Sequence, residues 1–383
     1  MKKYIAKRFQ NDGGTGLTLN TAALEKYSDI IDLSIGDTDF TTDEAIIDAA
    51  FRDARAGYTH YGAPRGDAEL IAATCRAWEE DFGQKLDKDH VIVTASSCMG
   101  MALAMMAILD PGDEVIVFSP YFSMYRKQVE LAGGVCVEVP TYAEENYAID
   151  EARLRAAVTP RTKAIIFNNP NNPSGMAYDK STLELIADVA KGCDLLVAAD
   201  EIYTTYLYEG SYVPMRTLPG MAERTITLNS FSKNYLMTGW RVGVLIAEPE
   251  LLELVVKLAG AYIYTAPSVS QRAAIEALKN RDRIRETYVS AYRDRIFYSA
   301  DRIEQIPYLS LVRPKGTFYL FPGVEKTGLS APEFCNELLE RAHVLVTPGD
   351  AFGVTGKGHF RIACTVGIDK LKEAFDRMEK LKF

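Results

Sequence analysis

Short runs of apolar residues alternate along the chain with longer segments in which apolar positions recur at helical spacing. This alternation predicts a mostly parallel β-sheet covered by helices, because two parallel strands need a crossover segment between them. The seven strands are expected at 91–94, 114–118, 135–139, 164–167, 195–199, 225–228 and 242–247. Helices are expected between and after them, for example at 99–108, 182–191 and 251–258.

The pattern changes after Tyr264. A charged helical stretch at 271–305 is followed by two short runs, 309–312 and 317–321, that predict a strand, a turn and a second strand; a last helix is expected at 369–381. We therefore expect a large domain over 45–280, with three α/β/α layers, and a smaller α+β domain made of 1–44 together with 281–383. The glycine-rich segment 11–16 is expected to act as a flap over a site.

Composition narrows the possible partners. Of the 383 residues, 48% are hydrophobic and 25% charged, and the net charge of −9 argues against a nucleic-acid surface. No apolar run approaches the roughly 20 residues of a membrane helix, so no membrane partner is expected. The six cysteines are scattered without the spacing of a metal site or a redox motif, which predicts no metal, reduced thiols and a cytoplasmic protein.

Lys233 follows one of the predicted strands, between Ser232 and Asn234, and Arg241 lies eight positions further on. A lysine beside hydroxyl groups, with an arginine nearby, suits a cofactor that carries both an aldehyde and a phosphate. Lys233 would form a Schiff base with the aldehyde. Ser230, Ser232 and Arg241 would bind the phosphate. The pattern favours pyridoxal 5'-phosphate (PLP), although an exposed lysine and a solvated arginine explain the same residues.

Residues that follow the other strands bear on the same ligand, because open parallel sheets bind ligands at the carboxyl ends of their strands. Ser97 and Cys98 follow the first strand and open a helix, whose free amides form a natural phosphate site. A plain serine N-cap is the alternative. Phe122 follows the second strand and can stack on a flat heteroaromatic ring, although core packing is the commoner use of phenylalanine.

Two further strand ends supply groups for the ring of such a cofactor. Asn172 lies in a loop rich in Asn, Pro and Gly and can donate a hydrogen bond to a phenolate oxygen, a role that Tyr203 can share. Asp200 follows an apolar run, where an unpaired acid is costly to bury. A protonated pyridine nitrogen would offset that cost and keep the ring an electron sink, whereas capping a helix is the simpler use of Asp200. Together, the five strand ends fit one ligand.

These residues recur in motifs through which the chain resembles the class I and II aminotransferases, a family of fold type I PLP enzymes, over nearly its whole length. In chain order the motifs are Tyr61-Gly62-Ala63-Pro64-Arg65-Gly66, Asp110-Pro111-Gly112-Asp113-Glu114-Val115, Asn171-Asn172-Pro173-Ser174-Gly175, Asp200-Glu201-Ile202-Tyr203, Ser230-Phe231-Ser232-Lys233, Gly239-Trp240-Arg241-Val242-Gly243, Pro314-Lys315-Gly316-Thr317-Phe318-Tyr319, Pro348-Gly349-Asp350-Ala351-Phe352-Gly353 and Phe360-Arg361-Ile362-Ala363. The resemblance implies a transaminase that moves the amino group of an L-amino acid to a 2-oxo acid.

The resemblance also implies which residues surround the cofactor: Lys233, Asp200, Tyr203, Asn172, Phe122, Ser97, Cys98, Ser230, Ser232 and Arg241. Lys233, Asp200 and Tyr203 would be catalytic, with Lys233 as the proton shuttle. Arg361 would bind the substrate α-carboxylate beside Gly36 and Asn172. Tyr61 would reach the phosphate of a partner subunit, which implies a homodimer with shared active sites.

Other functions stay open on the residues alone. A PLP-dependent carbon–sulfur β-lyase, or another α,β-elimination enzyme, would use the same cofactor and base. A PLP-sensing regulator is disfavoured because the motifs leave no room for an added DNA-binding domain. A nicotinamide-dependent oxidoreductase is disfavoured because no G-x-G-x-x-G follows a predicted strand. The chain departs from the family at Ser96-Ser97-Cys98, where many relatives have glycines, and at 35–40, which lacks a frequent proline. These departures leave the substrates undetermined.

Overall fold

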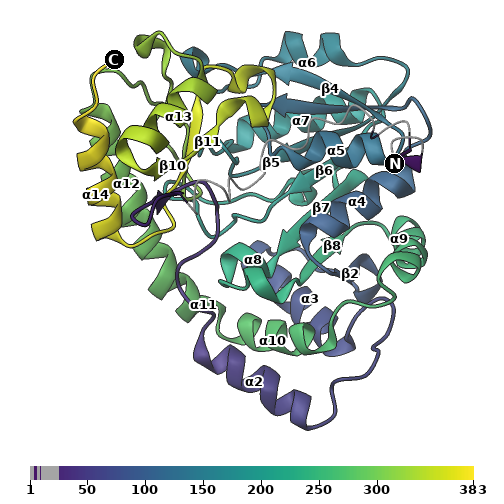
Figure 1. Ribbon diagram of the computed structural model, residues 1–383. Coiled ribbons are helices and arrows are strands. Elements are labelled where there is room, and N and C mark those ends of the chain that lie inside the picture. Colours follow the sequence, from purple (N-terminus) through teal and green to yellow (C-terminus); the bar gives the residue numbers. More distant parts are fainter. Residues whose placement is uncertain (1–3, 7–8, 10–25) are drawn as a thin grey trace.

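The computed structural model describes residues 4–6, 9 and 26–383, and its centre is a seven-stranded sheet with strand order β2-β8-β7-β6-β5-β3-β4 (Figure 1). In this sheet β8 runs in the opposite direction to the other six strands. The strands are β2 (Val91–Thr94), β3 (Glu114–Ser119), β4 (Val135–Pro140), β5 (Thr162–Asn168), β6 (Leu196–Asp200), β7 (Thr225–Ser230) and β8 (Gly243–Ile246). The prediction of a mostly parallel sheet with seven strands is confirmed.

Helices cover both faces of this sheet, because successive strand residues point to opposite sides. Val115 and Val117 of β3 pack with one apolar cluster under α4, α5 and α9, whereas Ile116 and Phe118 pack with another under α6 and α7. The helices of this part are α2 (Glu44–Arg55), α3 (Ala68–Phe82), α4 (Ser97–Ile108), α5 (Met124–Leu131), α6 (Glu151–Ala157), α7 (Lys180–Gly192), α8 (Phe231–Asn234), α9 (Pro249–Tyr262) and α10 (Ser268–Lys279). The predicted three layers follow from this packing.

The remaining elements gather at one end of the molecule (Figure 1). A separate apolar cluster there joins Ile31 and Leu33 to residues between 296 and 381. Its strands are β1 (Ile31–Asp32), β9 (Tyr319–Leu320), β10 (Val344–Leu345), β11 (Thr347–Pro348) and β12 (Phe360–Ala363), with β1 paired to β10 and β12 between β11 and β9. Its helices are α12 (Ser290–Glu304), α13 (Ala331–Ala342) and α14 (Ile368–Glu379), whereas the short α11 (Arg281–Ile284) packs through Ile284 with the apolar cluster of α2, α3 and α10.

One predicted strand is wrong. Within 309–312 only Ser310 pairs, as an isolated antiparallel bridge to Gly323. Pro314 follows the run and has no amide to donate, and Thr317 takes a left-handed conformation with φ 60°, so no regular ladder can continue from this run. The predicted helical stretch 271–305 is divided among α10, α11, a π-helical turn (Arg285–Val289) and α12.

The predicted flap, 11–16, lies outside the described residues. Among those that are described, none of the helices combines the length and the apolar character that crossing a membrane requires. The same part of the chain gathers no three His, Cys, Asp or Glu side chains into a possible metal site.

Candidate active site

A cavity of about 670 Å³ lies at the carboxyl ends of the parallel strands, between the large sheet and the β10–β12 region. It brings together twelve of the thirteen site residues that the sequence predicts: Gly36, Ser97, Cys98, Phe122, Asn172, Asp200, Tyr203, Ser230, Ser232, Lys233, Arg241 and Arg361. Segments more than 300 residues apart in the chain therefore share one cavity, as expected for a ligand site at the strand ends of an open sheet.

Lys233 reaches this cavity from α8, which begins directly after β7. The Ser230 side chain caps α8 by accepting a hydrogen bond from the Ser232 amide at 3.1 Å, which fixes the turn that presents the lysine. The Lys233 Nζ donates a hydrogen bond to the Gly36 carbonyl. Desolvation lowers the pKa of Lys233, so the neutral amine, which can act as a nucleophile or a base, becomes easier to form.

Asp200 is the last residue of β6 and is buried. One carboxylate oxygen accepts a hydrogen bond from the Tyr125 hydroxyl, and the other, Oδ1, has no partner in the described structure. Burial raises the pKa of Asp200 to about 6. No helix begins at Asp200, so the helix-cap alternative is wrong. An unpartnered buried carboxylate oxygen favours a ligand that carries a cationic N–H.

Arg361 lies in the middle strand of the β11-β12-β9 sheet and is buried. Its Nη1 donates to the Asn172 side-chain oxygen at 3.0 Å, and its Nη2 donates to the Ser34 carbonyl at 2.6 Å. Its Nε has no partner in the described residues, and burial lowers its pKa. The guanidinium also lies 4.6 Å from the centre of the Tyr319 ring. Neutral partners leave the positive charge available for a carboxylate.

The start of α4 forms another part of the wall. Ser96, with φ 105°, caps the helix by accepting a hydrogen bond from the Met99 amide at 3.2 Å. The serine cap and the phosphate site are therefore compatible, because Ser97 and Cys98 open the helix with amides that have no helical partner. Partial desolvation raises the pKa of the Cys98 thiol, which argues against a reactive thiolate.

The sequence reasoning missed several residues that shape the site. Tyr125, three residues after Phe122 on one side of α5, holds Asp200. Tyr319 ends the motif that begins at Pro314, and no role in the site was predicted for it. Its hydroxyl lies 3.2 Å from that of Tyr203. A Cβ on Gly36 would come within 1.7 Å of the Tyr319 hydroxyl oxygen, so only glycine fits there. The three-residue spacing between Phe122 and Tyr125 was a usable signal, whereas the Tyr319 contact was not readable from local sequence.

Tyr61 is the predicted residue that the cavity does not include. Its side chain is 80% exposed and meets only the edge of the Tyr264 ring, at 4.7 Å between ring centres, among the ring contacts of the described residues. Within one subunit, Tyr61 therefore takes no part in the cavity.

The model of the class I and II aminotransferases matches residues 28–378 of the chain. The chain is 35% identical over 381 residues to the putative aminotransferase YugH of Bacillus subtilis, covering 99% of this chain and 98% of the relative. It is 39% identical over 357 residues to aromatic-amino-acid aminotransferase 2 of Thermococcus litoralis, covering 92% and 91%. Among solved structures, aspartate aminotransferase from Thermus thermophilus with maleate superposes with a TM-score of 0.93 at 34% identity, covering 98% and 99%.

These relatives are aminotransferases, which supports transamination and not the elimination alternative. Enzymes of this class depend on PLP, and the cavity fits it through the free Asp200 oxygen, the amides that open α4 and the partly buried lysine. The chain belongs to the class I and II aminotransferases and is a PLP-dependent transaminase of fold type I, which moves the amino group of an L-amino acid to a 2-oxo acid.

Proposed function

We propose that Lys233 is the residue to which the cofactor aldehyde is covalently bound, and that it acts as the proton shuttle of the transamination. The support is its position at the start of α8, facing the cavity, and its lowered pKa. When bound, PLP supplies an electron sink for the electrons of the broken Cα–H bond. The neutral Lys233 amine would take the proton from the substrate Cα and deliver it to the former aldehyde carbon of the cofactor, because its return to Cα would regenerate the starting amino acid.

The unpartnered carboxylate oxygen of Asp200 is the strongest support for the proposal. Its unpartnered Oδ1 would accept a hydrogen bond from the protonated pyridine nitrogen, and its other oxygen stays fixed by Tyr125. The ionised form of Asp200 is then favoured by an adjacent positive charge. Asn172 and Tyr203 would bind the ring oxygen, and Phe122 would stack on the ring.

The phosphate would be held by a set of groups that line the cavity: the amides of Ser97 and Cys98, the hydroxyls of Ser230 and Ser232, and the guanidinium of Arg241. Helix-opening amides and a charge-assisted arginine contact are both suited to a phosphate dianion.

Arg361 would bind the α-carboxylate of the amino acid and of the 2-oxo acid through two parallel hydrogen bonds. Its unpartnered Nε supports this role, since a carboxylate would complete the set of acceptors around the guanidinium. Gly36 would let the substrate approach the backbone, beside the Tyr319 hydroxyl. The donor side chain stays open, and the relatives named above differ in this respect, one being an aromatic and one an aspartate aminotransferase.

We also propose a homodimer in which Tyr61 contacts the phosphate of the partner subunit. The exposed rings of Tyr61 and Tyr264 lie 4.7 Å apart, and the neighbouring His60 carbonyl accepts a hydrogen bond from Ser268 at the start of α10, so an exposed aromatic pair supports such an interface. A large domain at 45–280 and a small one at 1–44 with 281–383 are proposed on the separate apolar clusters of the two parts.

The unpaired state of all six cysteines supports the proposed cytoplasmic location.

The test is a visible absorption spectrum of the purified protein during addition of single amino acids without any oxo acid. A stable conversion of bound PLP to its amino form, reversed by a 2-oxo acid, is expected. Borohydride reduction followed by peptide mass mapping should place the cofactor on Lys233. Accumulation of ammonia without conversion would contradict transamination, and a label on another lysine would contradict the assignment of Lys233.

A further inference from the structure

The segment that carries Tyr61 connects α2 to α3 across residues 56–67 and is largely exposed. Within it, the described contacts of the tip are few: Tyr61 meets Tyr264, and the His60 carbonyl accepts a hydrogen bond from the Ser268 hydroxyl at 2.6 Å. A loop with so little packing at its tip depends on its two ends for a defined position.

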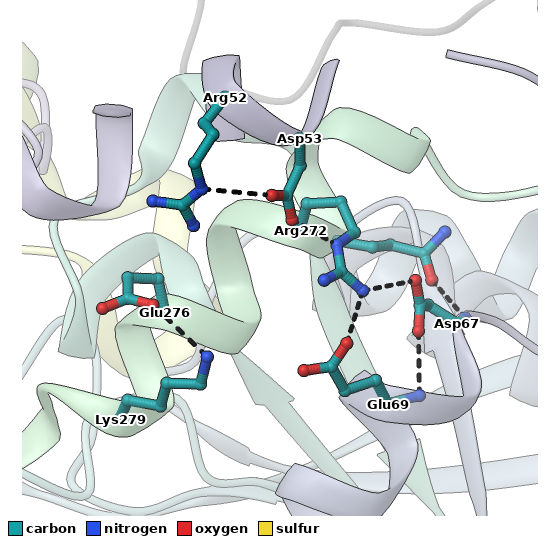
Figure 2. Close-up of polar contacts among 8 residues, drawn as sticks. Arg52, Asp53, Asp67, Glu69, Arg272, Glu276 and Lys279 are labelled. Carbon is teal, nitrogen blue, oxygen red and sulfur yellow. Dashed lines mark hydrogen bonds and ion pairs between the residues drawn. The ribbon is translucent and has the colours of Figure 1, made fainter. Parts of the chain in front are cut away.

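Arg272 of α10 lies beneath these ends, surrounded by three carboxylates (Figure 2). Its Nε donates to Asp53 at 2.6 Å, and its Nη1 donates to Asp67 at 3.2 Å and to Glu69 at 2.7 Å. The guanidinium also lies 4.4 Å from the centre of the Tyr58 ring. The Arg272 side chain is only 12% exposed, so these contacts are partly protected from solvent screening.

The partners of Arg272 lie on both sides of the loop. Asp53 belongs to the last turns of α2, and Tyr58 lies within the loop. Asp67 is the N-cap of α3, where its side chain accepts the Glu69 amide at 2.8 Å. One guanidinium therefore joins the beginning of the loop to its end.

The residue before Arg272 reinforces the same end of the loop. The Gln271 side-chain oxygen accepts a hydrogen bond from the Asp67 amide at 2.6 Å, and its Nε2 donates to the Ala266 carbonyl at 2.9 Å. Next to it, Gly66 has φ 119°, and a Cβ there would come within 2.4 Å of Val93. The end of the loop is thus held closely against β2 and α10.

Three carboxylates around one cation leave an excess of negative charge, so the loop ends would repel one another without Arg272. A lysine would supply the charge but not the planar fork that reaches acids on two helices at once while its face lies on Tyr58. The arrangement needs an arginine in particular.

We infer that Arg272 is a positioning residue that fixes the loop carrying Tyr61, so that Tyr61 is presented to the cofactor phosphate of the partner subunit. This inference rests on the proposed role of Tyr61. Arg272 does not line the cavity, so it would act through the loop.

A double-mutant cycle on the holoenzyme tests the inference, with Arg272→Met, Tyr61→Phe and the double variant. The measured quantity is the rate at which PLP is released during dialysis, followed by the absorption of the bound cofactor. We expect each single variant to release PLP about tenfold faster, as for loss of one hydrogen bond to a charged group. The double variant should release it no faster than Tyr61→Phe, because both changes remove the same contact.

Arg281→Met is the matched control. Arg281 also pairs with two acids, Glu80 and Asp81, and its side chain is 18% exposed, but it lies at the other end of α3, away from the loop. Its loss should lower the thermal midpoint as Arg272→Met does and leave PLP release unchanged. Should Arg272→Met fail to fold, Arg272→Lys replaces it in the cycle.

Four results would overturn the inference. If the two substitutions multiply each other's effect on the rate of PLP release, Arg272 is a general stabilising residue. The same conclusion follows if Arg281→Met releases PLP as fast as Arg272→Met. Unchanged release in both Arg272 variants would remove the role altogether. A normal rate of PLP release from Tyr61→Phe would contradict the proposed role of Tyr61 and, with it, this inference. The other results would contradict the role of Arg272 and leave the proposed role of Tyr61 standing.

Discussion

The cavity and the Arg272 cluster both collect charged side chains from distant elements, but they balance charge in opposite ways. In the cluster, the guanidinium of Arg272 meets Asp53, Asp67 and Glu69. In the cavity, Lys233 meets a backbone carbonyl and Asp200 meets a phenol. Arg361 there contacts a side-chain amide and another carbonyl. Within the described chain, none of these three cavity charges forms an ion pair.

The unpaired charges of the cavity indicate where a ligand is expected. A protein that buries charge usually pairs it, because an unpaired buried charge costs several kcal/mol or shifts its pKa. In the cluster, acidic side chains of the protein pair with Arg272, whereas the charged groups of the cavity have only uncharged partners in the described chain. The missing partners are those that PLP and an amino acid supply: a pyridinium nitrogen, an aldehyde and a carboxylate.

Lys233→Ala should abolish turnover, with kcat falling by about ten-thousandfold or more, since it removes both the covalent attachment and the proton shuttle. PLP should still bind through the remaining contacts, which a fluorescence titration can measure. Lys163→Ala, at an exposed lysine of β5, is the control and should keep full activity. A Lys233→Ala enzyme with normal kcat would refute the central assignment.

Asp200→Asn should lower kcat/KM by about a thousandfold, because the ring nitrogen loses its anionic partner. In the cofactor-free protein, the same substitution should raise the free energy of unfolding at neutral pH. The pKa of Asp200 is raised to about 6 in the folded state, so the acid stabilises the fold only when protonated, and this contribution is lost as pH rises from about 4 to 6.

Chemical denaturation of the cofactor-free proteins measures that second effect. Above pH 6 the Asn variant should be more stable than the native chain by ~1–3 kcal/mol. The difference should disappear near pH 4, where Asp200 is neutral. A constant difference at all pH values would show that Asp200 does not titrate in this range.

Arg361→Lys should lower kcat/KM by about a hundredfold for every amino acid and oxo acid tested, because lysine keeps the charge and loses the two-pronged geometry. The spectrum of bound PLP should stay unchanged. Arg341→Lys, at an exposed arginine of α13, should behave as the native enzyme in steady-state kinetics. A loss confined to one substrate would mean that Arg361 binds a side chain rather than the common carboxylate.

Glu69→Gln should have the smallest effect, lowering the free energy of unfolding by less than ~0.5 kcal/mol. Its side chain is 49% exposed, and Arg272 keeps two other acids. Asp53→Asn, at a side chain that is only 16% exposed, should cost more in the same urea titration. The opposite order would mean that burial does not govern the strength of this cluster.

Much of the site was readable from the sequence because its residues follow strand ends. Phe122, Asn172 and Lys233 each come shortly after an apolar run, and parallel strands bring such positions to one edge. The contacts that complete the site were not readable in this way. Tyr319 comes from β9, 116 positions from Tyr203, and no local pattern relates the two residues.

The wrong prediction of a strand at 309–312 has a similar physical reason. The run 309–312 has the apolar character of a strand, but its partners depend on how the chain turns at Pro314 and Thr317. Local hydrophobicity predicts that such a segment is buried, and it does not decide whether a neighbouring strand is available to pair with it.

The alternation of apolar runs and helical segments was enough to predict the seven strands, and the residue types that follow the strands were enough to predict a PLP site with Lys233 and Asp200. Arg361 was assigned to that site only through the resemblance to the aminotransferase family. Three features could be read only from the folded chain: the strand order β2-β8-β7-β6-β5-β3-β4, the Tyr125 contact with Asp200, and the three acids around Arg272. These depend on which helix faces pack together. Helix packing is a sum of many weak contacts between residues far apart in the chain, and no single segment encodes it.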